Sequence, residues 1–175
     1  DETLLIDTDY LMLDTSLLKL FEQDFDYRIM SWNNKPAGAW ALKMGQCSHN
    51  YLWATAILFR KTPKAKMLFD LVGRIQRNYL YYIKLYHIRE GNFRNDYAFS
   101  IADNILNGYT PSQGIPWRML TIDNPIEQIQ IQDNRLIIRE KESAHVVPVQ
   151  SVHVIDKDYL QSIQYQQFID NVCVN

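Results

Sequence analysis

The sequence predicts an α/β protein, and three patterns along the chain support this. Residues 4–13 form an apolar run interrupted only by two carboxylates, which is typical of a buried strand in a sheet covered on both faces. Residues 51–59 form another strand-like run, and residues 64–86 then show apolar side chains at helical spacing. Residues 126–139 have the pattern of a β-hairpin with Asp133-Asn134 as its turn. We therefore expect a sheet flanked by helices, with a hairpin appended near the C-terminus.

Length and composition place the chain among globular proteins. It has 175 residues, of which 47% are hydrophobic, and we expect one domain over residues 1–175. The net charge of -2 gives no general attraction to nucleic acid or to an anionic membrane, and no apolar run is long enough for a membrane span. Cys47 and Cys173 are far apart and have no metal-binding spacing. These features favour a cytoplasmic protein in a reducing compartment.

Three short features separate the first two long strands. Residues 14–16 offer N-cap side chains for a short helix at residues 17–22. Residues 26–30 fit another strand, and residues 31–40 form a loop rich in turn residues that contains two tryptophans, Trp32 and Trp40. A loop tryptophan either stacks on a sugar or base, or anchors the loop on the core.

The middle of the chain is expected to be helical. Thr62 and Pro63 provide the N-cap and first-turn signals for one long helix over residues 64–86. We expect the tyrosines of residues 79–82 to pack in the core. The basic face of this helix, which we expect to be solvated, contains Lys64, Lys66, Arg74, Arg77 and Lys84.

The remaining elements follow in the last half of the chain. A second helix is expected to begin near residues 95–96 and to end before Asn107-Gly108. Residues 146–155 fit a strand that Pro148 interrupts, which places the strand at a sheet edge or a bulge. Residues 159–174 fit a terminal helix.

The pair Asp7 and Asp9 is the main chemical signal in the sequence. Two carboxylates inside a buried strand would be costly to desolvate, so we expect the strand to end at Asp7 and Asp7-Thr8-Asp9 to turn over the carboxyl edge of the sheet. At that edge they could hold a divalent cation that also binds a diphosphate. The alternative is that they cap the following turn or helix.

The order of these motifs resembles the carboxyl-terminal half of the GT-A-fold nucleotide-sugar glycosyltransferases, and the glycogenin-like branch most of all. The resemblance rests on Asp7-Thr8-Asp9 after an apolar strand, a strand and helix after a Trp/Gly loop, a helix opened by Arg94-Asn95-Asp96, and His153 with Lys157. It implies a Rossmann-like mixed sheet flanked by helices. It also implies that the amino-terminal nucleotide-binding half is missing, so that a preceding segment or a partner chain completes the sheet.

The resemblance also implies roles for single residues. Asp7, Asp9 and His153 would ligate Mn²⁺ or Mg²⁺, and Asp7 could also reach the ribose of the nucleotide. Lys157 would contact the diphosphate, and Asp96 would face the donor sugar or the acceptor. The implied reaction moves a sugar from a nucleoside-diphosphate sugar to an unidentified acceptor, while the cation stabilises the leaving diphosphate. Because a ligating histidine must be neutral, metal binding should weaken below about pH 6.

Other interpretations of the same residues remain open. Asp96 could be a helix N-terminal acid favoured by the helix dipole, and His153 a strand histidine with a local hydrogen bond. A haloacid-dehalogenase-type phosphatase would use Asp7 as nucleophile and Asp9 as general acid, although Leu11 stands where that family has Thr or Val. The third alternative is a non-catalytic GT-A-like domain used for binding or assembly.

Overall fold

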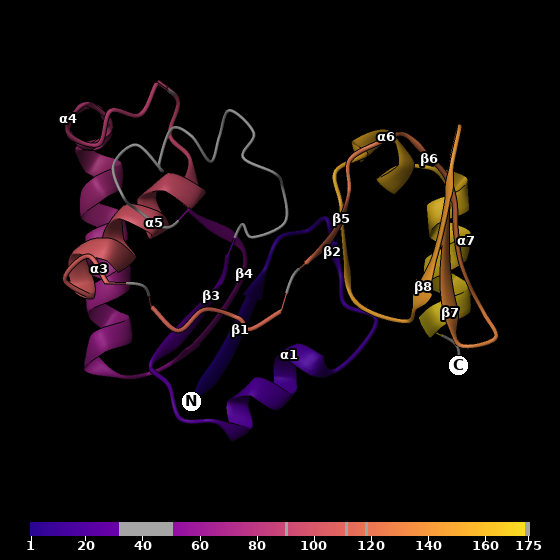
Figure 1. Ribbon diagram of the computed structural model, residues 1–175, viewed down its shortest axis with the longest axis horizontal. Coiled ribbons are helices and arrows are strands. Elements are labelled where there is room, and N and C mark those ends of the chain that lie inside the picture. The colour runs from indigo at the N-terminus through magenta and orange to yellow at the C-terminus, as the bar shows by residue number, and fades with distance from the viewer. Residues whose placement is uncertain (32–50, 90, 111, 118, 174–175) are drawn as a thin grey trace. The chain divides into compact units, whose positions relative to one another are not determined.

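The computed structural model describes residues 1–31, 51–89, 91–110, 112–117 and 119–173 (Figure 1). The chain divides into two compact units, which we call unit 1 (residues 1–7 and 20–118) and unit 2 (residues 8–19 and 119–175). Two compact units can belong to one domain, so the single domain expected from the sequence stays a prediction. Among the described residues, none of the helices has the length and apolar character needed to cross a membrane. The predicted loop with Trp32 and Trp40 lies outside the described residues.

Unit 1 contains a three-stranded antiparallel sheet in the order β1-β4-β3. Its strands are β1 (Glu2–Ile6), β3 (Tyr27–Ser31) and β4 (Leu52–Arg60). The strand β1 ends directly before Asp7, as predicted, but it is an edge strand whose residues are exposed or half-buried. The expectation of a buried strand over residues 4–13 was therefore wrong, because among the described strands β1 has a neighbour on one side only.

The helices of unit 1 follow the predicted caps but not all the predicted lengths. Those among the described residues are η1 (Leu20–Glu22), α3 (Pro63–Arg77), α4 (Tyr79–Leu85) and α5 (Asn95–Leu106). The Ala65 N–H donates to Thr62 Oγ1 over 3.2 Å, which confirms Thr62 as the N-cap of α3. The single helix expected over residues 64–86 is wrong, because Asn78 ends α3 and its side-chain amide donates to the Arg74 carbonyl.

The core of unit 1 lies between the sheet, α3 and α5. Its fully buried members include Ile57, Leu68, Ile75, Tyr97 and Ile101. The tyrosine cluster of α4 divides between core and surface, because Tyr79 and Tyr82 are buried whereas Tyr81 is exposed. The basic face predicted for this region is exposed to solvent.

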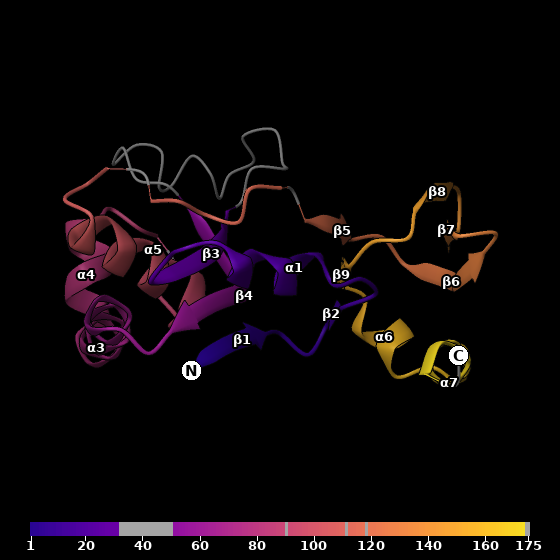
Figure 2. The same ribbon diagram turned by 90° about the horizontal axis from the view of Figure 1, so that it is seen from below.

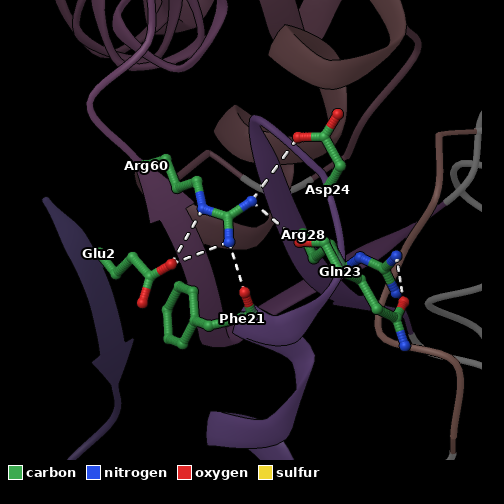
Figure 3. Close-up of polar contacts among 6 residues, drawn as sticks. All are labelled: Glu2, Phe21, Gln23, Asp24, Arg28 and Arg60. Atoms are coloured by element: carbon green, nitrogen blue, oxygen red, sulfur yellow. Dashed lines mark hydrogen bonds and ion pairs between the residues drawn. The ribbon is translucent and has the colours of Figure 1, made fainter.

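Arg60, the last residue of β4, forms hydrogen bonds with the neighbouring strand β1 and with the end of η1 (Figure 3). Its guanidinium donates to Glu2 Oε1 over 2.8 Å and 3.1 Å. It also donates to the backbone carbonyls of Phe21 and Gln23 at the end of η1. The last carbonyls of a helix have no partner within the helix, so the arginine satisfies them.

Unit 2 contains two sheets of three strands. The first has the order β2-β9-β5, in which β9 (Val152–Val154) pairs antiparallel with β2 (Tyr10–Leu11) and parallel with β5 (Leu120–Ile122). The second is antiparallel in the order β6-β7-β8 and consists of β6 (Ile126–Gln132), β7 (Arg135–Glu140) and β8 (Ala144–Pro148). The predicted hairpin is confirmed, and its turn residues Asp133 and Asn134 have φ angles of 49° and 57°. Such positive angles at both positions are those of a type I′ turn.

Other parts of unit 2 correct the sequence-based expectations. The strand expected over residues 146–155 is two strands, β8 and β9, which belong to different sheets. The terminal helix expected over residues 159–174 is likewise two helices, α6 (Lys157–Leu160) and α7 (Ile163–Cys173). The short helix α1 (Ser16–Lys19) begins where residues 14–16 predicted, with the Ser16 N–H donating to Asp14 Oδ1.

The chain is thus an α/β protein, as its sequence predicts, and its described residues form three small sheets. The core of unit 2 includes the fully buried residues Leu136, Ile138, Val152 and Val154.

Candidate functional site

The pairing of β2 with β9 places Asp9 beside His153, although 143 residues separate them in the sequence. Tyr10 lies opposite His153 in the ladder, and the Val154 N–H donates to the Asp9 carbonyl over 2.8 Å. This backbone hydrogen bond extends the ladder to Asp9 and fixes the backbone position from which its side chain extends. Asp9 Oδ1 then lies 3.3 Å from His153 Nε2.

Lys157 approaches the same carboxylate from the first turn of α6. Its ammonium forms an ion pair and a short hydrogen bond with Asp9 Oδ2. The lysine side chain is 60% exposed, whereas that of Asp9 is 13% exposed and that of His153 is 5% exposed. His153 is therefore buried and Asp9 half-buried, while the Lys157 side chain lies on the solvent side of the site.

Asp156 holds α6 in place, and the sequence analysis did not identify this role. As the N-cap of α6, it accepts hydrogen bonds at Oδ1 from the N–H groups of Asp158 and Tyr159, both over 3.1 Å. Its other oxygen accepts the N–H of Ile126 over 2.8 Å, which ties the start of α6 to the start of β6. The signal in the sequence was the acid itself, because Asp directly before a helix is a preferred N-cap.

The electrostatics of Asp9 favour its charged form. Burial raises the pKa of Asp9, but the hydrogen bond from Lys157 and the electrostatic interactions with His153 and Lys157 outweigh burial and hold the pKa below its usual value. Asp9 is therefore a carboxylate at neutral pH. The Lys157 ammonium supplies the opposite charge that a half-buried carboxylate needs.

One oxygen of this carboxylate has no hydrogen bond. Asp9 Oδ1 is buried and accepts none from the described residues, although His153 Nε2 is near. A buried carboxylate oxygen without a donor is costly, and a cation would satisfy it. A carboxylate oxygen and an imidazole nitrogen are also a donor set that Mn²⁺ accepts. Asp9 Oδ1 and His153 Nε2 are thus two atoms of unit 2 that could ligate a divalent ion.

Asp7 is the last residue of unit 1. Its N–H donates to the Thr55 carbonyl over 2.9 Å, and its Oδ2 accepts a hydrogen bond from the Thr55 hydroxyl over 3.1 Å. The side chain is exposed to solvent. These contacts hold Asp7 at the end of β1, and its role as a metal or ribose ligand stays a prediction.

Asp96 lies near Asp7 in unit 1, at a bulge of β4. The register between β3 and β4 shifts after Ile29, so that Ala54 has no partner on β3. The Ala54 N–H instead donates to Asp96 Oδ1 over 2.8 Å. Burial raises the pKa of Asp96, and the charge of Asp7 adds to this increase. Asp96 thus lies in the first turn of α5, as the alternative interpretation expected, but its carboxylate binds β4 and does not cap the helix. A contact with sugar stays a prediction.

Neither a family model, a curated protein nor a solved structure matches this chain. The resemblance to GT-A-fold glycosyltransferases therefore rests on the residues of the sequence alone. Of the predicted site residues, Asp9, His153 and Lys157 come together in unit 2, while Asp7 and Asp96 lie in unit 1.

Proposed function

We propose that the chain binds a divalent cation and a nucleoside diphosphate, and that it transfers a sugar from the corresponding nucleotide sugar to an acceptor. The observation that supports this most strongly is the meeting of Asp9, His153 and Lys157 in unit 2. Because Asp9 is distant in the sequence from His153 and Lys157, local helix capping or turn formation does not account for its meeting with them.

The three side chains have complementary roles in this proposal. Asp9 and neutral His153 hold the cation, and water or phosphate oxygens complete its coordination. A bound divalent ion neutralises the negative charge that develops on the departing diphosphate. Lys157 adds a second positive charge on the phosphate side, since its side chain is the most exposed of the three. Asp7 is the proposed second carboxylate.

The Lys157–Asp9 ion pair gives the site a resting state without metal. Lys157 neutralises Asp9, so the half-buried carboxylate is never left without a countercharge. With a cation bound to Asp9, the flexible lysine is released from Oδ2 and is free to contact a phosphate oxygen. Removing Lys157 should therefore strengthen binding of the metal alone and weaken binding of the nucleotide.

Thermal unfolding with Mn²⁺, and with Mn²⁺ plus UDP or GDP, tests the proposed binding. A ligand present at 100 times its Kd stabilises the folded state by about 2.7 kcal/mol, which is a measurable increase in Tm. Asp9→Asn and His153→Asn should abolish the Mn²⁺ effect, and Lys157→Gln should retain it while losing the additional effect of the nucleotide. Asp158→Asn is the matched control, because Asp158 is an exposed acid beside Lys157.

Two outcomes would overturn the proposal at different levels. If Mn²⁺ does not raise Tm, or raises it equally in Asp9→Asn and His153→Asn, the metal site is wrong. If Mn²⁺ and nucleotide bind but no UDP- or GDP-sugar releases its sugar to water or acceptor, the transfer reaction is wrong and binding alone remains. Asp7→Asn measures separately whether the second carboxylate contributes.

A further inference from the structure

The helix α4 of unit 1 exposes an apolar face. Three of its seven residues are large, apolar and more than half exposed: Leu80 at 66%, Tyr81 at 63% and Leu85 at 53%. Figures 1 and 2 show α4 at the margin of unit 1, next to the end of α3. This inference concerns unit 1 only and is independent of the proposed function.

The exposed residues share one side of the helix. Residues 80, 81, 84 and 85 follow the i, i+1, i+4, i+5 spacing of a single helical face, and Lys84 is the fourth member. The opposite side contributes Tyr79, Tyr82 and Ile83 to the core. A helix that is apolar all round is normally covered on all sides, whereas a surface helix has a polar outer face. The outer face of α4 is therefore unusual for a helix that meets only water.

The chain around this face is basic. Arg74, Arg77 and Arg89 are exposed and close to α4 in the sequence, and Lys84 lies within the face. Between Asp70 and Asp96 the sequence has a single acidic residue, Glu90. This local excess of positive charge contrasts with the net charge of -2 for the whole chain.

We propose that the outer face of α4, formed by Leu80, Tyr81, Lys84 and Leu85, docks on an anionic lipid bilayer. Leucine side chains would enter the interface between headgroups and acyl chains, and tyrosine is suited to that depth because its ring is apolar and its hydroxyl is polar. Lys84 and the neighbouring arginines would contact anionic headgroups, each contributing to binding through the negative surface potential.

The charge of the face argues against a second copy of the chain as the occupant. In a symmetric dimer the same patch meets itself, so that the basic side chains in and near the patch would be brought together across the interface. Like charges brought together in this way oppose association. An anionic lipid bilayer instead complements both parts of the face, the apolar side chains through its acyl chains and the basic side chains through its headgroups.

Co-sedimentation of the full chain with vesicles tests this proposal. We expect binding to phosphatidylcholine vesicles that contain phosphatidylserine, little binding to vesicles of phosphatidylcholine alone, and weakening by added salt. Replacing Leu80, Tyr81 and Leu85 together by serine should weaken binding by at least about tenfold. Lys84→Gln should weaken it by about fivefold, which corresponds to about 1 kcal/mol for one cation near the surface.

Ile163→Ser is the matched control, because Ile163 is an apolar residue of unit 2 with 74% exposure. It should bind vesicles like the wild type. The proposal is overturned if the wild type does not sediment with anionic vesicles, or if Ile163→Ser weakens binding as much as the triple variant. It is also overturned if the triple variant instead abolishes a concentration-dependent dimer, or if the face binds polyglutamate but not vesicles. Unchanged circular dichroism and Tm show that each variant is folded.

Discussion

Asp96 accepts the Ala54 N–H at a bulge where β4 has lost its partner on β3. The next turn of α5 repeats this arrangement, because Ser100 Oγ accepts the Leu52 N–H over 2.8 Å. Two side chains four residues apart on α5 thus satisfy two alternate N–H groups of one strand. A buried N–H without an acceptor is costly, so Asp96 stabilises the fold whether or not it also contacts a ligand.

Substitutions at Asp96 separate its hydrogen bond from its charge. Asp96→Ala should lower the free energy of unfolding by about 1–3 kcal/mol, because the Ala54 N–H loses its acceptor. Asp96→Asn retains an acceptor oxygen and removes the charge. Burial raises the folded-state pKa of Asp96 above 3.8, so the native state holds the proton more tightly and this carboxyl destabilises the protein as pH rises through that pKa.

Urea unfolding at pH 4.5 and pH 7 measures both effects. The stability of Asp96→Asn relative to the wild type should increase from pH 4.5 to pH 7, since the variant lacks the carboxyl group whose pKa is raised. Asp70→Asn, at an exposed acid of α3, is the control and should change stability by less than about 0.5 kcal/mol. A difference between Asp96→Asn and wild type that stays constant with pH would contradict this account.

At the scale of elements, α6 depends on contacts beyond its own four residues, because isolated helices of this length are unstable. Asp156 caps it and binds the Ile126 N–H, and the Tyr159 hydroxyl accepts the Ile129 N–H over 2.9 Å. Two side chains of the α6 segment thus bind the backbone of β6. The same contacts fix the position from which Lys157 reaches Asp9.

Asp156→Ala should destabilise the protein by about 1–3 kcal/mol and should expose the amides of residues 157–160 to hydrogen exchange. Asp156→Asn should cost less, because Asn is also a good N-cap. The Ile126 N–H, and then the two amides of α6, lower the pKa of Asp156 below 3.8. The wild type should therefore have a larger free energy of unfolding than Asp156→Asn above pH 4, and this difference should disappear as pH falls through the lowered pKa. Unchanged exchange at residues 157–160 in Asp156→Ala would contradict the capping role.

Elements with local signals were predictable from the sequence. Thr62-Pro63 marks the start of α3, and Asp133-Asn134 marks the turn of the β6–β7 hairpin, because a few neighbouring side chains decide both structures. The break at Asn78 was missed, since the apolar spacing continues through it into α4. Periodicity detects a buried face but does not detect a residue at which one helix ends and another begins.

At the scale of the whole molecule, the pairing of distant segments limited the prediction. The apolar run at residues 4–13 divides at Asp7, so that β1 pairs with β4 in unit 1 and β2 pairs with β9 in unit 2. The sequence shows that both halves are apolar, but it does not show which partner each half takes. The candidate site was predicted in part because family resemblance supplied the pairing of Asp9 with His153 and Lys157. Asp156 was missed as their support: its position before α6 is a local N-cap signal, but its bond to the Ile126 N–H joins two separate segments and has no local signal.

The division into two units also makes a prediction about unfolding. Ile101 and Ile138 are fully buried in separate apolar clusters, in unit 1 and unit 2 respectively. Replacing either by alanine leaves a cavity and should lower stability by about 2–5 kcal/mol, whereas Ile163→Ala at an exposed site should have little effect. Because each cavity lies in one cluster, amide exchange should increase mainly in the unit that contains the substitution. An equal increase in both units for both variants would instead mean that residues 1–175 unfold as one cooperative domain, as the sequence analysis expected.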